Sequence, residues 1–207
     1  VLLVAVPMAY VSGQHSHLLA RADTRVLAAR WIEQNAETGE RIALCATSDY
    51  DYVRLRRTAK NLEAQLRELR AAGLPARRVA RQLHYGGRLP GPAYDLIELR
   101  LGAVRDARVT RGECDIGSLV ELKVDWLVVH ERDPRASPRL NEHFARQLAQ
   151  SAELAQLYEP YILSSDVEPI YDLADAFFAP VGGIAAVERP GPRVSIYRMK
   201  PNETNWH

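Results

Sequence analysis

The stretch TRVLAARWIEQNAETGERIALCAT, residues Thr24–Thr47, decides the fold class. Leu27 and its apolar neighbours recur at helical spacing and predict a helix that begins at Asp23 or Thr24 and ends at Gly39. The run RIALCAT that follows is apolar without alternation, which is typical of a strand buried on both faces of a parallel sheet. Helix, glycine and strand in this order indicate an α/β repeat.

The rest of the chain continues this pattern. The predicted elements are an amphipathic helix over about 52–72, a short helix over about 75–83, strands at Ala93–Leu101 and Asp125–His130, helices over 137–157 and 166–178, and a hairpin of Gly183–Glu188 with Arg193–Met199. We therefore predict one α/β domain over residues 21–200, with a mostly parallel sheet, flanking helices and a C-terminal β-hairpin. Residues 201–207 are a predicted flexible tail.

The first residues, VLLVAVPMAYV (Val1–Val11), are apolar and carry no charge. As a helix they span about 16 Å, roughly half of the ~30 Å hydrocarbon core of a bilayer. Two interpretations fit: a buried first strand or helix of the domain, or the outer half of a transmembrane helix. The polar sequence SGQHSH that follows favours the second. Residues 1–20 are therefore interpreted as the end of a transmembrane helix and a juxtamembrane linker.

Composition and cysteine usage limit the classes of function. The chain has 47% hydrophobic and 26% charged residues and a net charge of +1, so no global field attracts nucleic acid. Cys45 lies in an apolar run, which favours a buried thiol, while a disulfide with Cys114 stays open in an oxidising compartment. No cysteine or histidine spacing is typical of a zinc site, and we predict no metal or cofactor in this segment.

The candidates for ligand binding come from the predicted strand ends. The chain has no GxxxxGK[ST] loop, no GxSxG and no HExxH. Ligands of open α/β sheets bind beyond the carboxyl ends of parallel strands. The candidates are therefore Ser48 and Asp49 after the first strand, and His130 and Glu131 after the run DWLVVH. Solvated loops have the same polar composition, so a purely structural interpretation stays open.

Basic residues are concentrated in one region, since residues 54–88 carry ten basic side chains and two acids. One interpretation is a solvated helix face. The other is a surface that faces anionic lipid, polyprenyl-phosphate or other phosphate groups, where each nearby cation contributes about 1 kcal/mol. The predicted lipid contacts are Arg54, Arg56, Arg57 and Lys60. Nucleic acid is not a predicted partner, because no recognisable nucleic-acid-binding module accompanies the run.

Three stretches resemble one family. They are ADTRVLAARWIEQNAETGERIAL (Ala22–Leu44), LVELKVDWLVVHE (Leu119–Glu131) and ERPGPRVSIYRM (Glu188–Met199). In this order they resemble the C-terminal soluble region of bacterial GT-C membrane glycosyltransferases, the lipid-carrier-dependent kind related to protein mannosyltransferases. This chain resembles that region in three motifs: a DTR-like start of the first helix, the tripeptide WIE within that helix, and a last strand of the form GP-x-[IV]-x-[IV]-Y-R. The apolar stretch before Asp23 lies where the last transmembrane helix of such a protein ends.

The resemblance implies a function for the parent protein and none for this segment alone. The family transfers a sugar from a polyprenyl-phosphate carrier, with a metal in some members, and its catalytic carboxylate lies in the first extracytoplasmic loop of the membrane part. No residue here corresponds to that carboxylate, so no catalytic residue is carried over. The implied location is the extracytoplasmic side of a bacterial cell membrane, and the implied partner is the membrane part of the same protein. The segment over about 49–117 matches the family pattern only loosely.

Three functions therefore remain as hypotheses. The first is an accessory domain of a membrane glycosyltransferase with a cell-envelope acceptor. The second is a membrane-tethered binding or interaction module without enzymatic activity. The third is a free-standing small α/β enzyme that uses the crevice around Asp49 and His130.

Overall fold

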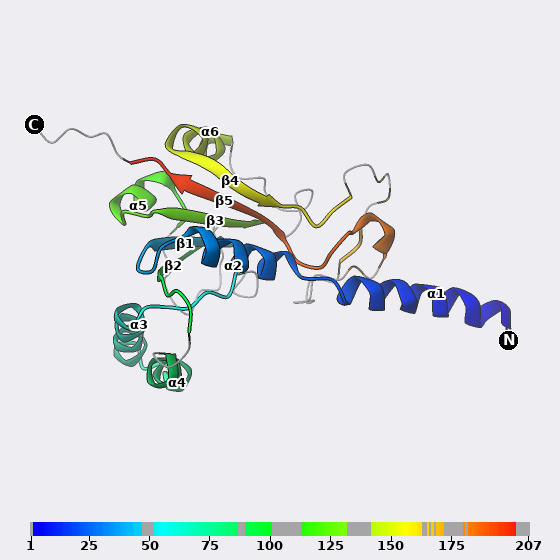
Figure 1. The fold of residues 1–207 in the computed structure, drawn as a ribbon, viewed down its shortest axis with the longest axis horizontal. Coiled ribbons are helices and arrows are strands. Elements are labelled where there is room, and N and C mark those ends of the chain that lie inside the picture. Colours follow the sequence, from blue (N-terminus) through cyan, green and yellow to red (C-terminus); the bar gives the residue numbers. More distant parts are fainter. Residues whose placement is uncertain are drawn as a thin grey trace, which may run out of the picture.

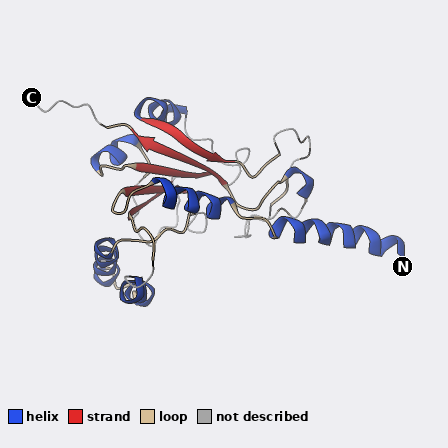
Figure 2. Cartoon of the chain, viewed as in Figure 1, coloured by secondary structure: helices blue, strands red, loops and turns tan. Residues whose placement is uncertain are grey.

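The structure is a computed structural model, and it describes residues 2–46, 52–86, 90–100, 113–131, 142–162, 165, 167, 169–171, 180 and 182–201. These residues form a single α/β domain around one five-stranded sheet, with the strand order β2-β1-β3-β5-β4 (Figures 1 and 2). The strands are β1 (Arg41–Ala46), β2 (Asp95–Arg100), β3 (Trp126–Glu131), β4 (Ala152–Tyr158) and β5 (Arg193–Met199). The strands predicted near 41–47, 93–101 and 125–130 are thus confirmed.

The sheet is mixed, so the prediction of a mostly parallel sheet is not confirmed. Strands β2, β1 and β3 run parallel, whereas β5 pairs antiparallel with both β3 and β4. The difference arises at β5, which lies between two neighbours instead of at an edge. Val194 and Ile196 of this strand have no exposed surface, which fits an interior strand.

The predicted C-terminal hairpin is wrong. Residues Ile184–Ala186 form a single 3₁₀ turn, η1, and the segment before β5 is not its partner strand. Gly183 adopts a left-handed conformation at φ +66°, which interrupts an extended chain at this point. The alternating pattern of β5 was interpreted correctly as a strand, but the pattern carries no information on which strands lie beside it.

The helices cover both faces of the sheet (Figure 1). They are α1 (Leu2–Leu19), α2 (Thr24–Asn35), α3 (Ala59–Ala71), α4 (Arg77–Gly86), α5 (Ile116–Glu121) and α6 (Glu142–Ser151). Ile42 and Leu44 of β1 pack with α2 on one face. Ala43 and Cys45 face the other way, where α5 and α6 provide Leu119, Phe144 and Leu148. The unbroken apolar run of β1 therefore reflects burial on both faces.

Several predicted helices differ in their bounds. The helix predicted to end at Gly39 ends at Asn35, with Ala36 as its C-cap, and the helix predicted over 75–83 spans Arg77–Gly86. The helix predicted from residue 52 begins only at Ala59, with Thr58 as its N-cap, because residues 52–57 are extended and Arg57 pairs with Tyr94. The helix predicted to residue 157 ends at Ser151, and the next residue starts β4. The sequence AELAQLY favours a helix by propensity, but pairing with β5 overrides it. The helix predicted over 166–178 falls largely outside the described residues, as does the tail from residue 202.

Helices α3 and α4 form a hairpin to one side of the sheet (Figure 1). Leu62 and Leu66 of α3 pack against Val79 of α4 in a small core separate from the two cores of the sheet. Gly73, at φ +66°, follows the end of α3 and terminates it.

Helix α1 projects from the domain, with the N-terminus at its outer end (Figure 1). Within residues 8–19, Leu18 is the only buried residue, and it packs with Val187 near η1. Met8 and Tyr10 are 68% and 67% exposed. In the part of the chain that the structure describes, no helix combines the length and apolarity that crossing a membrane needs.

Cys45 and Cys114 form a disulfide, with their Cα atoms 6.1 Å apart. Cys45 is fully buried, as predicted, but the interpretation as a free thiol is wrong. The bond joins β1 to the segment that leads into α5, and it closes a loop with a sequence separation of 69 residues. Constraining a loop of this length in the unfolded chain stabilises the fold by about 4 kcal/mol.

Candidate functional site

The structure confirms the neighbourhood from which the ligand-binding candidates were drawn. Strands β1 and β3 are adjacent and parallel, with Cys45 opposite Val129, so their carboxyl ends lie at the same edge of the sheet. Ser48 and Asp49, predicted after β1, lie outside the described residues. His130 and Glu131 are the last residues of β3.

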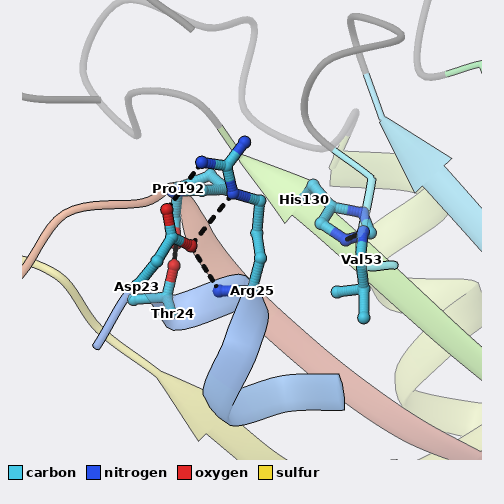
Figure 3. Close-up of polar contacts among 6 residues, drawn as sticks. All are labelled: Asp23, Thr24, Arg25, Val53, His130 and Pro192. Carbon is cyan, nitrogen blue, oxygen red and sulfur yellow. Dashed lines mark hydrogen bonds and ion pairs between the residues drawn. The ribbon is translucent and has the colours of Figure 1, made fainter. Parts of the chain in front are cut away.

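His130 lies inside the core at this edge, with no exposed surface (Figure 3). Its Nε2 accepts a hydrogen bond of 3.1 Å from the backbone N–H of Val53. Its Nδ1 lies 3.1 Å from the carbonyl oxygen of Cys45. Because a carbonyl only accepts and an N–H only donates, the ring carries its proton on Nδ1 and is neutral.

The surroundings of His130 favour the neutral ring strongly. Burial lowers its pKa to about 4, and the charge of Arg25 adds to the effect, while the hydrogen bond to Cys45 opposes it. Tyr52 packs edge-on against the imidazole, and its hydroxyl donates to the carbonyl of Leu99. The histidine thus ties residues 52–53 to the end of β1. In this arrangement it holds the fold together and presents no atom to a ligand.

Glu131 takes part in a charged cluster at the same strand end. Its carboxylate is 3.6 Å from the guanidinium of Arg193, which also lies 3.1 Å from Glu159. Burial raises the pKa of Glu159, and Arg193 opposes that shift. Arg193 of β5 thus pairs with an acid of β3 and with the acid that follows β4, so the cluster links the ends of three neighbouring strands.

Helix α2 begins beside this edge on a tightly built contact with the turn before β5 (Figure 3). Asp23 caps the helix by accepting from the backbone N–H of Arg25 at 2.7 Å, and its carboxylate also pairs with the Arg25 guanidinium at 2.6 Å. Thr24 donates from its backbone N–H to Pro190 at 3.0 Å and from its hydroxyl to Pro192 at 2.7 Å.

Gly191 makes this contact possible. Its φ is +112°, and a Cβ atom placed on it would lie 2.0 Å from the hydroxyl oxygen of Thr24. Any side chain there would collide with the helix start and strain the backbone. The RPGP turn and the DTR helix start are therefore complementary to each other, although they are far apart in the sequence.

The three stretches that carry the family resemblance form one contiguous unit. They supply α2, β1, β3 and β5, and these three strands are neighbours in the sheet. At the edge of the sheet opposite His130, each stretch contributes one side chain to a cluster of two tryptophans and an arginine. Trp31 packs edge-on against Trp126 at 5.5 Å, and the Arg198 guanidinium lies 4.5 Å from the centre of the Trp126 ring. Packing therefore gives these residues a physical role that needs no ligand.

No protein-family model, curated protein sequence or solved structure matches this chain.

A shallow cavity of about 500 Å³ lies beside the start of α2, lined by Asp23, Arg25, Arg30, Glu33 and Arg54 among others. Its charges are mixed, and Asp23 and Arg25 neutralise each other. Among the described residues, no group of three or more histidine, cysteine or acidic side chains is placed to hold a metal ion. The arrangement therefore favours no particular ligand.

The four residues predicted to contact lipid differ in their environment. Arg54 and Lys60 are exposed. Arg56 instead donates to the carbonyls of Gly86 and Gly91, at 2.8 and 2.6 Å. Arg57 pairs with Glu98 and donates to Asn61. Arg56 and Arg57 thus hold the α3–α4 hairpin against the sheet.

Two arginines on α4, Arg78 and Arg81, were not singled out from the sequence. They line a second cavity together with Arg56 and Arg57. The sequence shows the positive charge of residues 54–88 directly. It does not show which of these arginines are bound within the fold, because that depends on contacts with Glu98 and with backbone carbonyls of distant residues.

Proposed function

We propose that this chain is the extracytoplasmic accessory domain of an integral-membrane glycosyltransferase. In this proposal the parent protein transfers a sugar from a polyprenyl-phosphate carrier to a cell-envelope acceptor on the outer side of a bacterial membrane. The domain catalyses nothing by itself, needs no cofactor of its own and shapes the acceptor side of the membrane part. The observation that carries the tethered placement is α1, an apolar helix that projects from the domain and on which Met8, Tyr10 and Val11 are exposed.

The disulfide supports an extracytoplasmic location. Stable disulfides form in secreted and extracytoplasmic proteins and are rare in the reducing cytosol. The Cys45–Cys114 bond lies in the core, where Cys45 is fully buried and Cys114 is 7% exposed. A bond buried in this way is protected from reductants while the protein stays folded.

The glycosyltransferase part of the proposal rests on the resemblance. Two findings are compatible with an accessory role. The three resembling stretches form the centre of the fold, and His130, one of the four ligand-binding candidates at the strand ends, is buried in the core. A domain in which the residues that resemble the family serve packing is suited to positioning the acceptor instead of catalysing its reaction.

The test uses the full-length protein in membranes together with this chain. We expect the isolated chain to show no turnover on a polyprenyl-phosphate sugar, and the full-length protein to transfer the sugar. Deleting residues 21–200 is expected to lower transfer to the acceptor. A reading frame with a single apolar segment upstream of Val1, or turnover by the isolated chain on a small substrate, would contradict the proposal.

The predicted lipid contact of Arg54, Arg56, Arg57 and Lys60 forms a separate part of the proposal. These residues precede and start α3, which Figure 1 places toward the end of the longest axis opposite the N-terminus. Contact with the bilayer that holds α1 therefore requires a bend between α1 and α2. Co-sedimentation with vesicles tests it: R54A/K60A should weaken binding that depends on anionic lipid, and binding indifferent to lipid charge or salt would contradict it.

A second candidate is a tethered binding module without enzymatic activity. The observation that favours it is the basic cavity at α4, because a concave site of several hundred cubic ångströms is the usual form of a small-molecule site. The two candidates differ in the upstream sequence: a glycosyltransferase requires many membrane segments, and a tethered module requires one.

A further inference from the structure

A cavity of about 500 Å³ lies between α4 and the extended segment before α3. Five residues of α4 line it, and four of them, Arg78, Arg81, Gln82 and Tyr85, have a spacing of i, i+3, i+4 and i+7. This spacing places them on one face of the helix. Val79 lies on a different face and packs into the core of the α3–α4 hairpin. Helix α4 therefore has one face for the hairpin core and one for the cavity.

The charge of the cavity wall is of one sign. Arg56, Arg57, Arg78 and Arg81 contribute guanidinium groups, and no carboxylate is among the described residues that line the cavity. Arg57 is neutralised by Glu98. Arg56 is bound to carbonyl groups, which leave its charge in place. A concave wall with unbalanced positive charge attracts and concentrates anions.

Arg78 and Arg81 are the groups free to bind a ligand. Both are exposed on α4, and neither forms an ion pair within the part of the chain that the structure describes. Each guanidinium offers a planar set of donors that matches the oxygens of a phosphate or carboxylate. The helix spacing places the two side chains next to each other, so they can bind one anionic group together.

The same cavity has an apolar side. Leu55, which is half-buried, and Tyr85, which is 55% exposed, line it with accessible apolar surface, while the buried Leu62 forms its floor. An inorganic anion leaves these surfaces in contact with water. A ligand that carries an apolar group next to its charge covers them, and that burial adds to the binding free energy.

We propose that this cavity binds an amphipathic anion, with a phosphate-type head on Arg78 and Arg81 and an apolar body against Leu55, Leu62 and Tyr85. Helix α4, which lines the cavity, lies away from the outer end of α1 (Figure 1). A ligand delivered from solution, as a monomer, therefore reaches it more directly than a head group of the bilayer that α1 enters. This last step depends on the proposed tethering, whereas the site itself does not.

The test measures binding of octyl phosphate, kept below its micelle concentration, to the whole 207-residue chain by isothermal titration calorimetry. We expect one molecule bound per chain, with binding weakened by salt. R78A/R81A should weaken binding by at least about tenfold, because it removes two charge-assisted contacts. The matched control is R67A/R70A, which removes two exposed arginines of α3 that do not line the cavity and should change binding by less than about twofold. Circular dichroism of both variants checks that they are folded.

Three probes separate the elements of the proposal. Inorganic phosphate should bind more weakly than octyl phosphate, and equal affinity would overturn the apolar part of the site. Octanol should not bind detectably, and affinity equal to that of octyl phosphate would overturn the role of the arginines. Binding to phosphatidylglycerol vesicles without binding of the monomer would overturn delivery from solution. An equal loss of binding in R78A/R81A and R67A/R70A would overturn the site altogether.

Discussion

At the scale of single residues, His130 links the stability of the domain to pH. Its pKa is about 4 in the fold, against an ordinary value of 6.5, because burial disfavours the charged ring. Between pH 6.5 and 4 the unfolded chain therefore binds the proton more readily than the folded one. The stability due to the neutral ring is complete above pH 6.5, and about 3 kcal/mol of it is lost as the pH falls to 4.

H130Q tests this linkage, because glutamine does not gain a proton in this range. At pH 7.5 we expect the variant to be less stable by about 2 kcal/mol, since the N–H of Val53 or the carbonyl of Cys45 loses its partner. Between pH 6.5 and 4 the variant should lose less stability than the wild type. The measurement is the free energy of unfolding in guanidinium chloride at several pH values. Identical slopes in the two proteins would show that folding does not lower the pKa of His130.

Gly191 provides a second test at the scale of one residue. G191A introduces a Cβ atom 2.0 Å from the Thr24 hydroxyl oxygen and also strains a backbone at φ +112°. We expect a loss of about 3 kcal/mol or more in the free energy of unfolding. G39A is the matched control, because Gly39 also has a positive φ, +93°, but nothing lies within 4 Å of its added Cβ. Its loss should be about 1 kcal/mol, and equal losses would mean that the turn and the helix start are not in contact.

The residues also show how far the site could be predicted from the sequence. The position of His130 at the end of a buried strand followed from the pattern DWLVVH, and the structure places it in the last two residues of β3. Its burial did not follow, because Val53, which bonds to it, lies in a segment predicted to be helical. Similarly, the basic run was visible, but Arg57 is neutralised by Glu98 on β2, a contact between distant parts of the chain.

At the scale of elements, prediction succeeded where the local pattern decides the outcome. Strands β1 and β3 are buried on both faces, so their unbroken apolar runs identified them. Helix α2 was identified by its cap at Asp23. Prediction failed at β4, at the parallel character of the sheet and at the hairpin before β5. In each case the observed structure depends on which strands pair with β5. Contacts between distant parts of the chain determine this pairing, and a local sequence pattern does not contain them.

The disulfide belongs to this scale because it joins β1 to the segment before α5. C45A/C114A should unfold more easily by about 4 kcal/mol, since the unfolded chain loses a constraint across 69 residues. The measurement is the urea midpoint of the variant against that of the wild type, both without reductant. Dithiothreitol should lower the wild-type midpoint to that of the variant and leave the variant unchanged. A variant as stable as the wild type would show that the bond does not form in the protein.

At the scale of the whole molecule, α1 decides whether the domain is attached to a membrane. Met8, Tyr10 and Val11 of this helix are apolar and exposed, whereas within residues 8–19 the packing with the domain is confined to Leu18. An exposed apolar surface of this kind is typical of a segment that enters another apolar phase. The domain core does not need these residues, so changes in them should leave the stability of the sheet unaltered.

M8D/V11D therefore tests membrane attachment without disturbing the fold. Each aspartate costs about 2.5–3.5 kcal/mol at the centre of a membrane helix and less near the interface. We expect co-sedimentation with phosphatidylcholine vesicles to fall by at least about tenfold, while the thermal midpoint of the domain stays unchanged. L19D is the matched control, because Leu19 is 54% exposed at the other end of the same helix and lies beyond the apolar run. Uncharged vesicles exclude the arginines as the cause of binding, since their attraction depends on anionic lipid. If M8D/V11D and L19D bind equally well, α1 is not the membrane anchor, and the tethered placement of the domain is wrong.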